Sequence, residues 1–168
     1  MNIASINSFL EEQFGDELAA AFIYGSVASG RAHPGSDIDF FVITVRELTP
    51  GRRHRTAVRF AELQRGLGFT PDPDYPVEIF SVAACESLLA GVVLDAALRN
   101  TLLTGAIDPS LIESDDIEVL CALLDRRLVL RRGPVLDQLT SQAQELLDRH
   151  TDDVAQLRRA LKLTEDAR

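Results

Sequence analysis

The chain has 168 residues, with a hydrophobic fraction of 46% and a charged fraction of 26%, which is ordinary for a soluble globular protein. No apolar run approaches the roughly 20 residues that a membrane helix needs, and the acidic N-terminal segment lacks the basic flank of a signal peptide, so we expect a cytoplasmic protein. The net charge of −9 disfavours long nucleic acid as a partner, because each phosphate contact needs a cation.

The first half of the chain alternates between helical and strand patterns. Apolar residues recur at helical spacing up to Phe14, and Gly15 then provides a stop. Two later apolar runs are short and bounded by Gly, Ser or Pro, as is typical of buried strands. In chain order we predict a helix over 3–14, a strand over 18–24, a loop over 25–36, a strand over 37–44, a helix over 53–66 and a strand over 77–82.

The second half is predicted to be mainly helical. Helical patterns cover 83–103, 115–125 and 136–163, and the segment 127–131 predicts one short additional strand. We therefore expect a catalytic core over 1–82 and a mainly helical region over 83–168. Cys85 and Cys121 show no ligand spacing, and we interpret both as buried thiols.

Two acidic residues open the second predicted strand. Asp37 and Asp39 follow the Gly25-Ser26 turn after ten intervening residues. Side chains two apart on a strand point to the same face, so the two carboxylates are expected to lie side by side. Two negative charges at such a short distance need a positive counter-charge, which a hard cation such as Mg²⁺ supplies. The turn, the acidic pair and the apolar strand together predict a magnesium site.

Other acidic residues offer a second pair and a third carboxylate. Asp72 and Asp74 stand between prolines, where a solvated turn is the better interpretation because Asp favours turns. Glu78 instead lies inside the apolar run VEIFSV, where a charge is costly unless it is paired or metal-bound. Phosphoryl transfer with two metal ions uses a further carboxylate. Glu78 is our candidate for it, and an edge-strand position facing water is the alternative.

The loop between the first two strands offers groups that suit a phosphate. Gly25 lets the backbone approach a ligand closely, and Ser26 presents a hydroxyl and an N–H suited to a phosphate oxygen. Ser36, directly before Asp37, is placed either to bind the same phosphates or to support the turn. An ordinary Gly-Ser turn is the alternative for the first two residues.

The segment GSVASGRAHPGSDIDFFVIT resembles the signature of the polymerase β-like nucleotidyltransferases, a Gly-Ser turn followed by a strand with Asp-x-Asp. Its spacing is similar to that of the minimal nucleotidyltransferases and the aminoglycoside nucleotidyltransferases. The resemblance covers residues 18 to 44 and extends to about residue 82. It implies an α+β fold with a small mixed sheet and flanking helices. It assigns the triphosphate to Gly25 and Ser26, and the metals and catalysis to Asp37, Asp39 and Glu78.

The same resemblance implies a reaction in which an acceptor attacks the α-phosphorus of a nucleoside triphosphate, with ATP favoured, and releases pyrophosphate. Two Mg²⁺ ions are expected, for which Mn²⁺ can substitute. Family members often have Asp at the third carboxylate position, so Glu78 is a departure from the pattern.

The acceptor is left open between two classes. A cationic small molecule would be attracted by the negative charge of the chain. A partner protein is the alternative, as in antitoxins of the minimal nucleotidyltransferase type. A non-catalytic module that binds a nucleotide or a partner on the same scaffold is a third alternative. The apolar segment from Ala83 to Leu103 suits either an acceptor pocket or a homo-oligomer interface.

Overall fold

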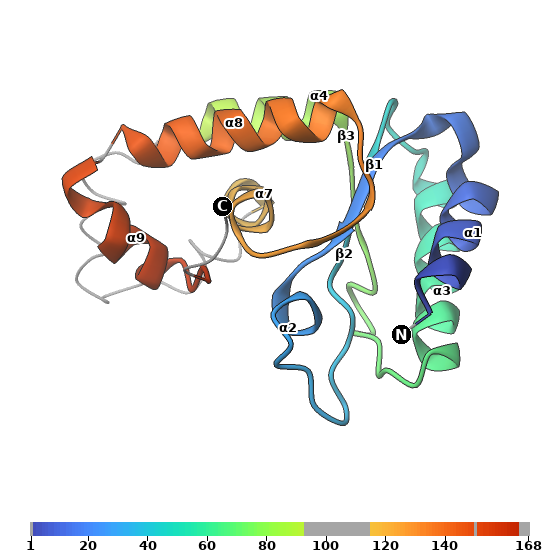
Figure 1. Cartoon of the computed structure of the whole chain (residues 1–168). Helices are drawn as coiled ribbons and strands as arrows, with labels where there is room; N and C mark the ends of the chain where they lie inside the picture. The colour runs from blue at the N-terminus through green and yellow to red at the C-terminus, as the bar shows by residue number, and fades with distance from the viewer. Residues whose placement is uncertain (1, 93–114, 150, 165–168) are drawn as a thin grey trace. The chain divides into compact units, whose positions relative to one another are not determined.

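The computed structural model describes residues 2–92, 115–149 and 151–164 (Figure 1). Its helices and strands in chain order are α1 (Ile3–Phe14), η1 (Gly15–Glu17), β1 (Leu18–Ile23), α2 (Gly25–Ala28), β2 (Phe40–Thr44), α3 (Pro50–Gly66), β3 (Glu78–Ser81), α4 (Val82–Gly91), α7 (Asp115–Leu124), β4 (Leu128–Arg131), α8 (Pro134–Asp148), η2 (Thr151–Asp153) and α9 (Val154–Ala160). Within these described ranges, no helix is long and apolar enough to cross a membrane.

The described residues form two compact units. The first contains the chain up to Ala84 and the returning segment Arg127–Leu136, and the second contains the described residues from Cys85 onward outside that segment. The first unit is built on one four-stranded sheet in the order β3-β2-β1-β4. β1 runs antiparallel to both β2 and β4, whereas β2 and β3 are parallel. The mixed sheet with flanking helices confirms the predicted α+β fold class.

Helices α1 and α3 pack on one face of this sheet, as Figure 1 shows. Phe60 of α3 is fully buried at the centre of the packing, with ring centroids 4.9 Å from Phe9 and 5.0 Å from Phe40. α3 also connects β2 to β3, and a parallel pair needs such a crossover. In the parallel pair, Phe41 of β2 lies beside Glu78 of β3.

The opposite face of the sheet carries a row of stacked aromatic rings. The ring centroids of Phe22 and Phe41 are 5.0 Å apart, and those of Phe41 and Phe80 are 5.4 Å apart. Successive side chains of a strand point to opposite faces, so Glu78 shares a face with Phe80, two residues further on. Glu78 therefore lies on the face of the sheet that α1 and α3 do not cover.

The second unit is helical and has its own apolar core. Its buried residues come mostly from α7, α8 and α9: Ile117, Val119, Leu120, Leu123, Leu139, Ala143, Leu147 and Leu157. Asp125 fixes the end of the described chain, since its carboxylate accepts hydrogen bonds from the backbone and hydroxyl of Thr164 at 3.0 and 2.6 Å. Cys85 is buried as predicted, whereas Cys121 is only partly buried. Desolvation raises the pKa of each thiol to about 12.

The second strand is shorter than predicted. It begins at Phe40 rather than at Asp37, so both aspartates lie in the loop that leads into it. The cause is a tight turn around Asp39, in which the Phe40 N–H donates to the Ile38 carbonyl at 2.9 Å. The predicted start of the strand is therefore wrong, while burial still alternates here, with Ile38 and Phe40 buried and Asp37 and Asp39 partly exposed.

Two other elements differ from the sequence prediction, and a third is described only in part. The predicted loop after β1 contains the one-turn helix α2. Helix α3 begins at Pro50 rather than Arg53, because proline is well suited to the first turn of a helix and the Thr49 hydroxyl caps the Arg52 N–H at 3.4 Å. α4 covers the start of the helix predicted over 83–103, and the part beyond residue 92 lies outside the described residues.

Candidate active site

The predicted site residues lie around one end of the sheet in the first unit. Gly25 follows the last residue of β1, Asp37 and Asp39 precede β2, and Glu78 is the first residue of β3. Because β1 is antiparallel to β2 and β2 is parallel to β3, the end of β1 and the starts of β2 and β3 are at the same end. In Figure 1 this is the end from which α2 and its following loop extend.

Gly25 and Asp39 are in direct contact. Gly25 has a φ of +64°, a left-handed conformation that glycine adopts readily. A Cβ at this position would overlap Asp39 Oδ2 and lie 2.8 Å from its Cγ. The backbones are joined as well, since the Tyr24 N–H donates to the Asp39 carbonyl at 3.1 Å. The absence of a side chain at residue 25 therefore lets the carboxylate lie against the Gly-Ser turn.

The turn after Gly25 is held together by Ser29. The Ser29 hydroxyl donates to the Gly25 carbonyl at 2.8 Å and accepts from Arg31 Nε at 2.9 Å. The Ser26 carbonyl accepts from the Arg31 N–H at 2.8 Å. The Ser26 hydroxyl itself is partly exposed and has no hydrogen-bond partner among the described residues. It is therefore available to a ligand that reaches the turn.

Ser36 has a supporting position in the loop. It is 7% exposed, and its hydroxyl accepts a hydrogen bond from the His33 N–H at 3.0 Å. Its backbone closes the same turn, with the Ser36 N–H donating to the His33 carbonyl at 2.9 Å. The Ser36 carbonyl also accepts from the Thr70 N–H at 3.0 Å. These contacts favour the second of its two predicted roles, support of the turn.

Gln64 is the residue of this region that the sequence interpretation missed. It lies on the buried side of α3 and is fully buried. Its side-chain amide bonds to both backbone groups of Ile38, which stands between the two aspartates: Oε1 accepts from the Ile38 N–H at 2.8 Å and Nε2 donates to the Ile38 carbonyl at 3.2 Å. The only sequence signal was a polar residue on the inner face of a predicted helix.

The three carboxylates do not form a closed metal cluster. In the parts of the chain that the structure describes, no group of three or more His, Cys, Asp or Glu side chains is arranged to hold a metal ion. Asp37, Asp39 and Glu78 are all partly exposed. Carboxylate oxygens are ligands that Mg²⁺ prefers, and Mg²⁺ is commonly bound by one or two carboxylates together with substrate phosphates and water. The two aspartates therefore fit a magnesium ion that arrives with a nucleotide.

The second acidic pair has a structural role. Asp72 Oδ1 accepts hydrogen bonds from the backbone N–H groups of Asp74 and Tyr75, at 2.8 and 2.9 Å. This is an Asx-turn, in which a side chain replaces a backbone carbonyl. The interpretation of Asp72 and Asp74 as turn residues is thus correct.

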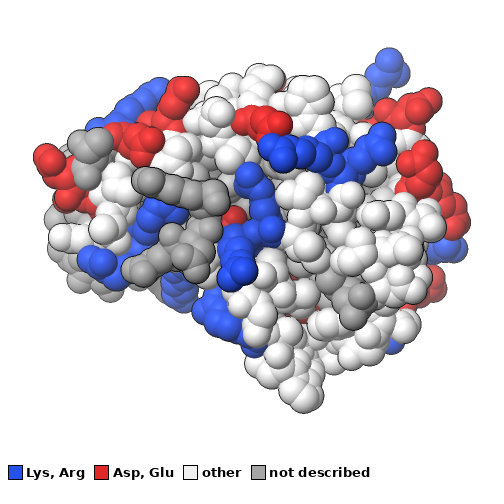
Figure 2. Space-filling model, in the orientation of Figure 1, with Lys and Arg blue, Asp and Glu red and all other residues white. Residues whose placement is uncertain are grey.

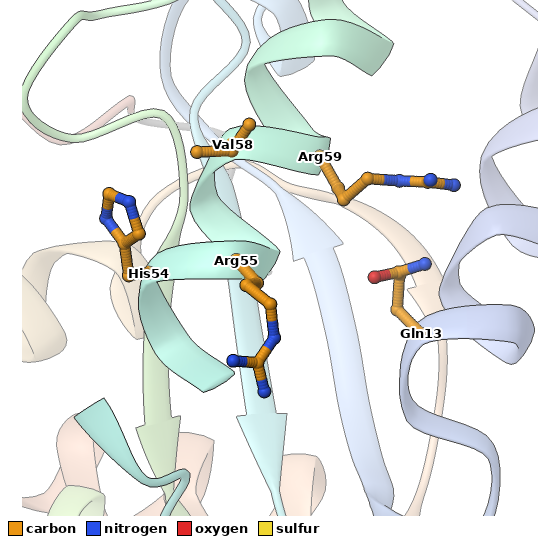
Figure 3. Close-up of a pocket in the computed structure, with 5 residues that line it drawn as sticks. All are labelled: Gln13, His54, Arg55, Val58 and Arg59. Carbon is orange, nitrogen blue, oxygen red and sulfur yellow. The ribbon is translucent and has the colours of Figure 1, made fainter. Parts of the chain in front are cut away.

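A surface pocket of about 400 Å³ lies on α1 and α3 (Figure 3). It is lined by Gln13, His54, Arg55, Val58 and Arg59, and none of the predicted site residues lines it. Acidic side chains gather over α1 in Figure 2. Two acidic residues near the N-terminus pair with arginines of α3. Arg59 Nη2 lies 3.3 Å from Glu12 Oε1, and Arg52 is paired with Glu17. Both arginine side chains are partly exposed, so these ion pairs lie on a solvated face of the helix.

Comparison with known proteins gives a family match and a structural likeness. The model of a family described as polymerase beta, nucleotidyltransferase, matches residues 4–93, more than half of the chain. No protein among those with curated functions matches this chain. Similar solved structures include a toxin–antitoxin crystallised with AMP-PNP, at 16% identity and a TM-score of 0.48 over 96% of both chains. Another is a mutant of the toxin–antitoxin MntA–HpeT, at 14% identity and a TM-score of 0.47 over 96% of both chains.

Proposed function

Since the chain belongs to the polymerase β nucleotidyltransferase family, we propose that it transfers an adenylyl group from ATP to a hydroxyl of a small-molecule acceptor, with Mg²⁺ as cofactor. The observation that supports this proposal is the contact between Gly25 and Asp39. It joins a turn suited to phosphate oxygens with a carboxylate suited to a magnesium ion. A nucleotide with its metal needs both groups in one place.

The proposed roles of the loop residues follow from their contacts. The backbone at Gly25 and the hydroxyl of Ser26 bind phosphate oxygens, since that hydroxyl has no hydrogen-bond partner among the residues described. Asp37 and Asp39 hold the magnesium ion. Ser36 maintains the loop through its bonds to His33, and its burial makes direct phosphate binding a smaller part of its role. Bound magnesium neutralises charge on the phosphate oxygens.

Glu78 is proposed as the group that accepts the proton of the acceptor hydroxyl. It is the first residue of β3, at the same end of the sheet as the aspartates. A carboxylate that removes a proton from a nucleophile commonly contributes a factor of about 10² to 10⁴ to a rate. The nucleophile then attacks the α-phosphorus and pyrophosphate leaves. Glu78 comes from a different strand than the two aspartates, so we assign it to the acceptor rather than to the first metal.

The acceptor class is proposed from charge. The chain carries a net charge of −9, which attracts cations and repels polyanions. A polyol that also bears ammonium groups, such as an amino sugar, has both the hydroxyl nucleophile and the positive charge. A partner protein remains the second class of acceptor, and the assay below separates the two.

The test uses ATP labelled at the α-phosphate, Mg²⁺, and amino sugars or neutral sugars of matched size as acceptors. We expect label to appear on the amino sugar with stoichiometric pyrophosphate, and not with Asp39→Asn. Label found instead on a protein from a cell extract would favour the protein acceptor. Tight Mg²⁺-dependent ATP binding with no transfer to either class would contradict the enzymatic proposal and leave a binding module.

A further inference from the structure

The side-chain amide of Gln64 connects the two segments that carry the carboxylates. Besides its two bonds to Ile38, Gln64 Nε2 donates to the Pro76 carbonyl at 2.8 Å. Ile38 stands between Asp37 and Asp39, and Pro76 stands two residues before Glu78. One buried side chain, 0% exposed, therefore spans the acidic loop and the start of β3.

The chemistry of these bonds requires an amide. The tight turn at Asp39 gives the Ile38 carbonyl one donor, the Phe40 N–H; Gln64 adds a second donor to that carbonyl and accepts from the Ile38 N–H. Buried backbone groups are costly to leave unpaired. A primary amide supplies one acceptor and two donor hydrogens, and all three functions are used here. Glutamate has no donor when ionised, and methionine has neither function.

The backbone of Gln64 is itself fixed at the end of α3. The Phe69 N–H donates to the Gln64 carbonyl at 3.0 Å, and the Gly68 N–H donates to the Arg65 carbonyl at 3.0 Å. With Gly68 at a φ of +85°, this pair of bonds forms a Schellman motif, a common helix terminus. The side-chain amide thus extends from an anchored backbone. Its three hydrogen bonds hold Ile38 and Pro76 relative to that backbone.

We propose that Gln64 is a positioning residue for the reaction: its amide holds the acidic loop and the start of β3 in the relative placement at which Asp37, Asp39 and Glu78 serve one bound nucleotide. This inference rests on the proposed function. Gln64 is buried behind the loop and acts only through Ile38 and Pro76.

The main test is calorimetry of ATP binding with Mg²⁺ and with EDTA. In Gln64→Met, a substitution of similar length, we expect the Mg²⁺-dependent affinity to fall about 10- to 100-fold, the usual effect of removing a residue that orients metal ligands. The weak binding measured in EDTA should be unchanged, since the phosphate contacts of Gly25 and Ser26 do not involve Gln64. A general loss of structure would lower both.

Thr44→Val is the matched control. Thr44 is also fully buried, and its hydroxyl bonds to the carbonyls of Arg46 at 2.7 Å and Phe80 at 3.4 Å, so it too links β2 to the β3 strand. It lies at the opposite end of β2 from the aspartates. We expect this variant to melt at a lower temperature and to keep the Mg²⁺-dependent affinity of the wild type.

A second variant covers the case in which Gln64→Met does not fold. Gln64→Asn keeps the amide but shortens its reach by one methylene, and should show a smaller loss of the same Mg²⁺-dependent affinity. Hydrogen exchange at the Ile38 amide, measured without ligand, should be slow in the wild type and faster in the Gln64 variants.

The outcomes separate the two proposals. Wild-type affinity for ATP with Mg²⁺ in a folded Gln64 variant would overturn the role of Gln64 alone. A wild type that shows no Mg²⁺-dependent binding would overturn the proposed function, and the role of Gln64 with it, even if exchange at Ile38 still showed the bonds. Equal losses in Gln64→Met and Thr44→Val would indicate a merely structural residue.

Discussion

The carboxylate of Asp39 lies directly against the α-carbon of Gly25, so residue 25 has room for a hydrogen atom and nothing larger. The contact joins the turn that follows β1 to the loop that precedes β2. Gly25 is needed there for two reasons, its left-handed φ of +64° and its clearance for the carboxylate. The two requirements can be separated by experiment.

Replacing Gly25 by alanine should cost both stability and activity, whereas Gly30→Ala should cost stability alone. Gly30 has a φ of +72°, but a Cβ there would have no atom within 4 Å. The strain of a left-handed alanine should destabilise each variant by roughly 1 kcal/mol, and Gly25→Ala should lose more because its Cβ overlaps the Asp39 carboxylate. Only Gly25→Ala displaces Asp39, and a displacement of about 1 Å in an active site can lower a rate on the order of 100-fold. Urea unfolding and the transfer assay measure the two effects. Equal activity in both variants would contradict the role of the contact.

Ser26 and Ser29 should respond in opposite ways to alanine. The Ser26 hydroxyl has no bond within the described residues, so Ser26→Ala should leave stability within about 0.5 kcal/mol of the wild type. It should weaken ATP binding about tenfold, because a hydrogen bond to a charged group contributes about 1.5 kcal/mol or more. Ser29→Ala breaks the bond to the Gly25 carbonyl and should lower stability by about 1 kcal/mol. Calorimetry and thermal melting distinguish the pair; unchanged ATP affinity in Ser26→Ala would remove Ser26 from the site.

The strands of the core could be predicted because short apolar runs bounded by Gly, Ser and Pro leave few alternatives. The start of β2 could not, since the chain there makes a tight turn at Asp39, and Ile38 bonds to Gln64, 26 positions away, instead of to a neighbouring strand. Local sequence around Asp37 and Asp39 continues the apolar pattern of the strand and gives no sign of the turn. The contribution of a distant buried glutamine appears only when the chain is folded.

For Glu78, too, one feature could be predicted from the sequence and another could not. An acidic residue in an apolar run was a sound reason to place a candidate carboxylate in the third strand. The strand register, however, sets Glu78 beside Phe41 rather than beside Asp39. That register is a property of the pairing between β2 and β3, and residue types along one strand do not encode it. The position of the strand was predictable, and the spacing of its carboxylate from the aspartates was not.

Glu78→Gln should separate binding from chemistry. If Glu78 accepts the proton of the acceptor, the amide should bind ATP and Mg²⁺ nearly as well as the wild type but transfer the adenylyl group about 10² to 10⁴ times more slowly. Asp74→Asn removes a negative charge from an exposed position in the preceding loop and serves as the control. Single-turnover kinetics and calorimetry on both variants provide the readouts. A Glu78→Gln enzyme that loses ATP binding instead would place this residue among the metal ligands.

The two cysteines should make the fold less stable at high pH. Burial raises the pKa of Cys85 and Cys121 from the usual 9.0 to about 12. The folded state then holds these protons more tightly than the unfolded chain, so stability is fully present below about pH 9 and is lost as pH rises toward 12. The variant Cys85→Ala/Cys121→Ala should lose less stability than the wild type between about pH 8.5 and about pH 10.5. Identical pH slopes in urea unfolding would show that the thiols are not protected by the fold.

The proposed function is tested most directly by calorimetric titration of ATP in the presence and absence of Mg²⁺, on the wild type and on Asp37→Ala/Asp39→Ala. We expect the wild type to bind ATP more tightly by a factor of about ten or more when Mg²⁺ is present, about 1.4 kcal/mol, because the ion joins the phosphates to the two carboxylates. The double variant should lose that increment and keep its folded structure. Equal ATP binding by both proteins, or no binding by the wild type, would contradict the proposal that these two aspartates hold a magnesium nucleotide.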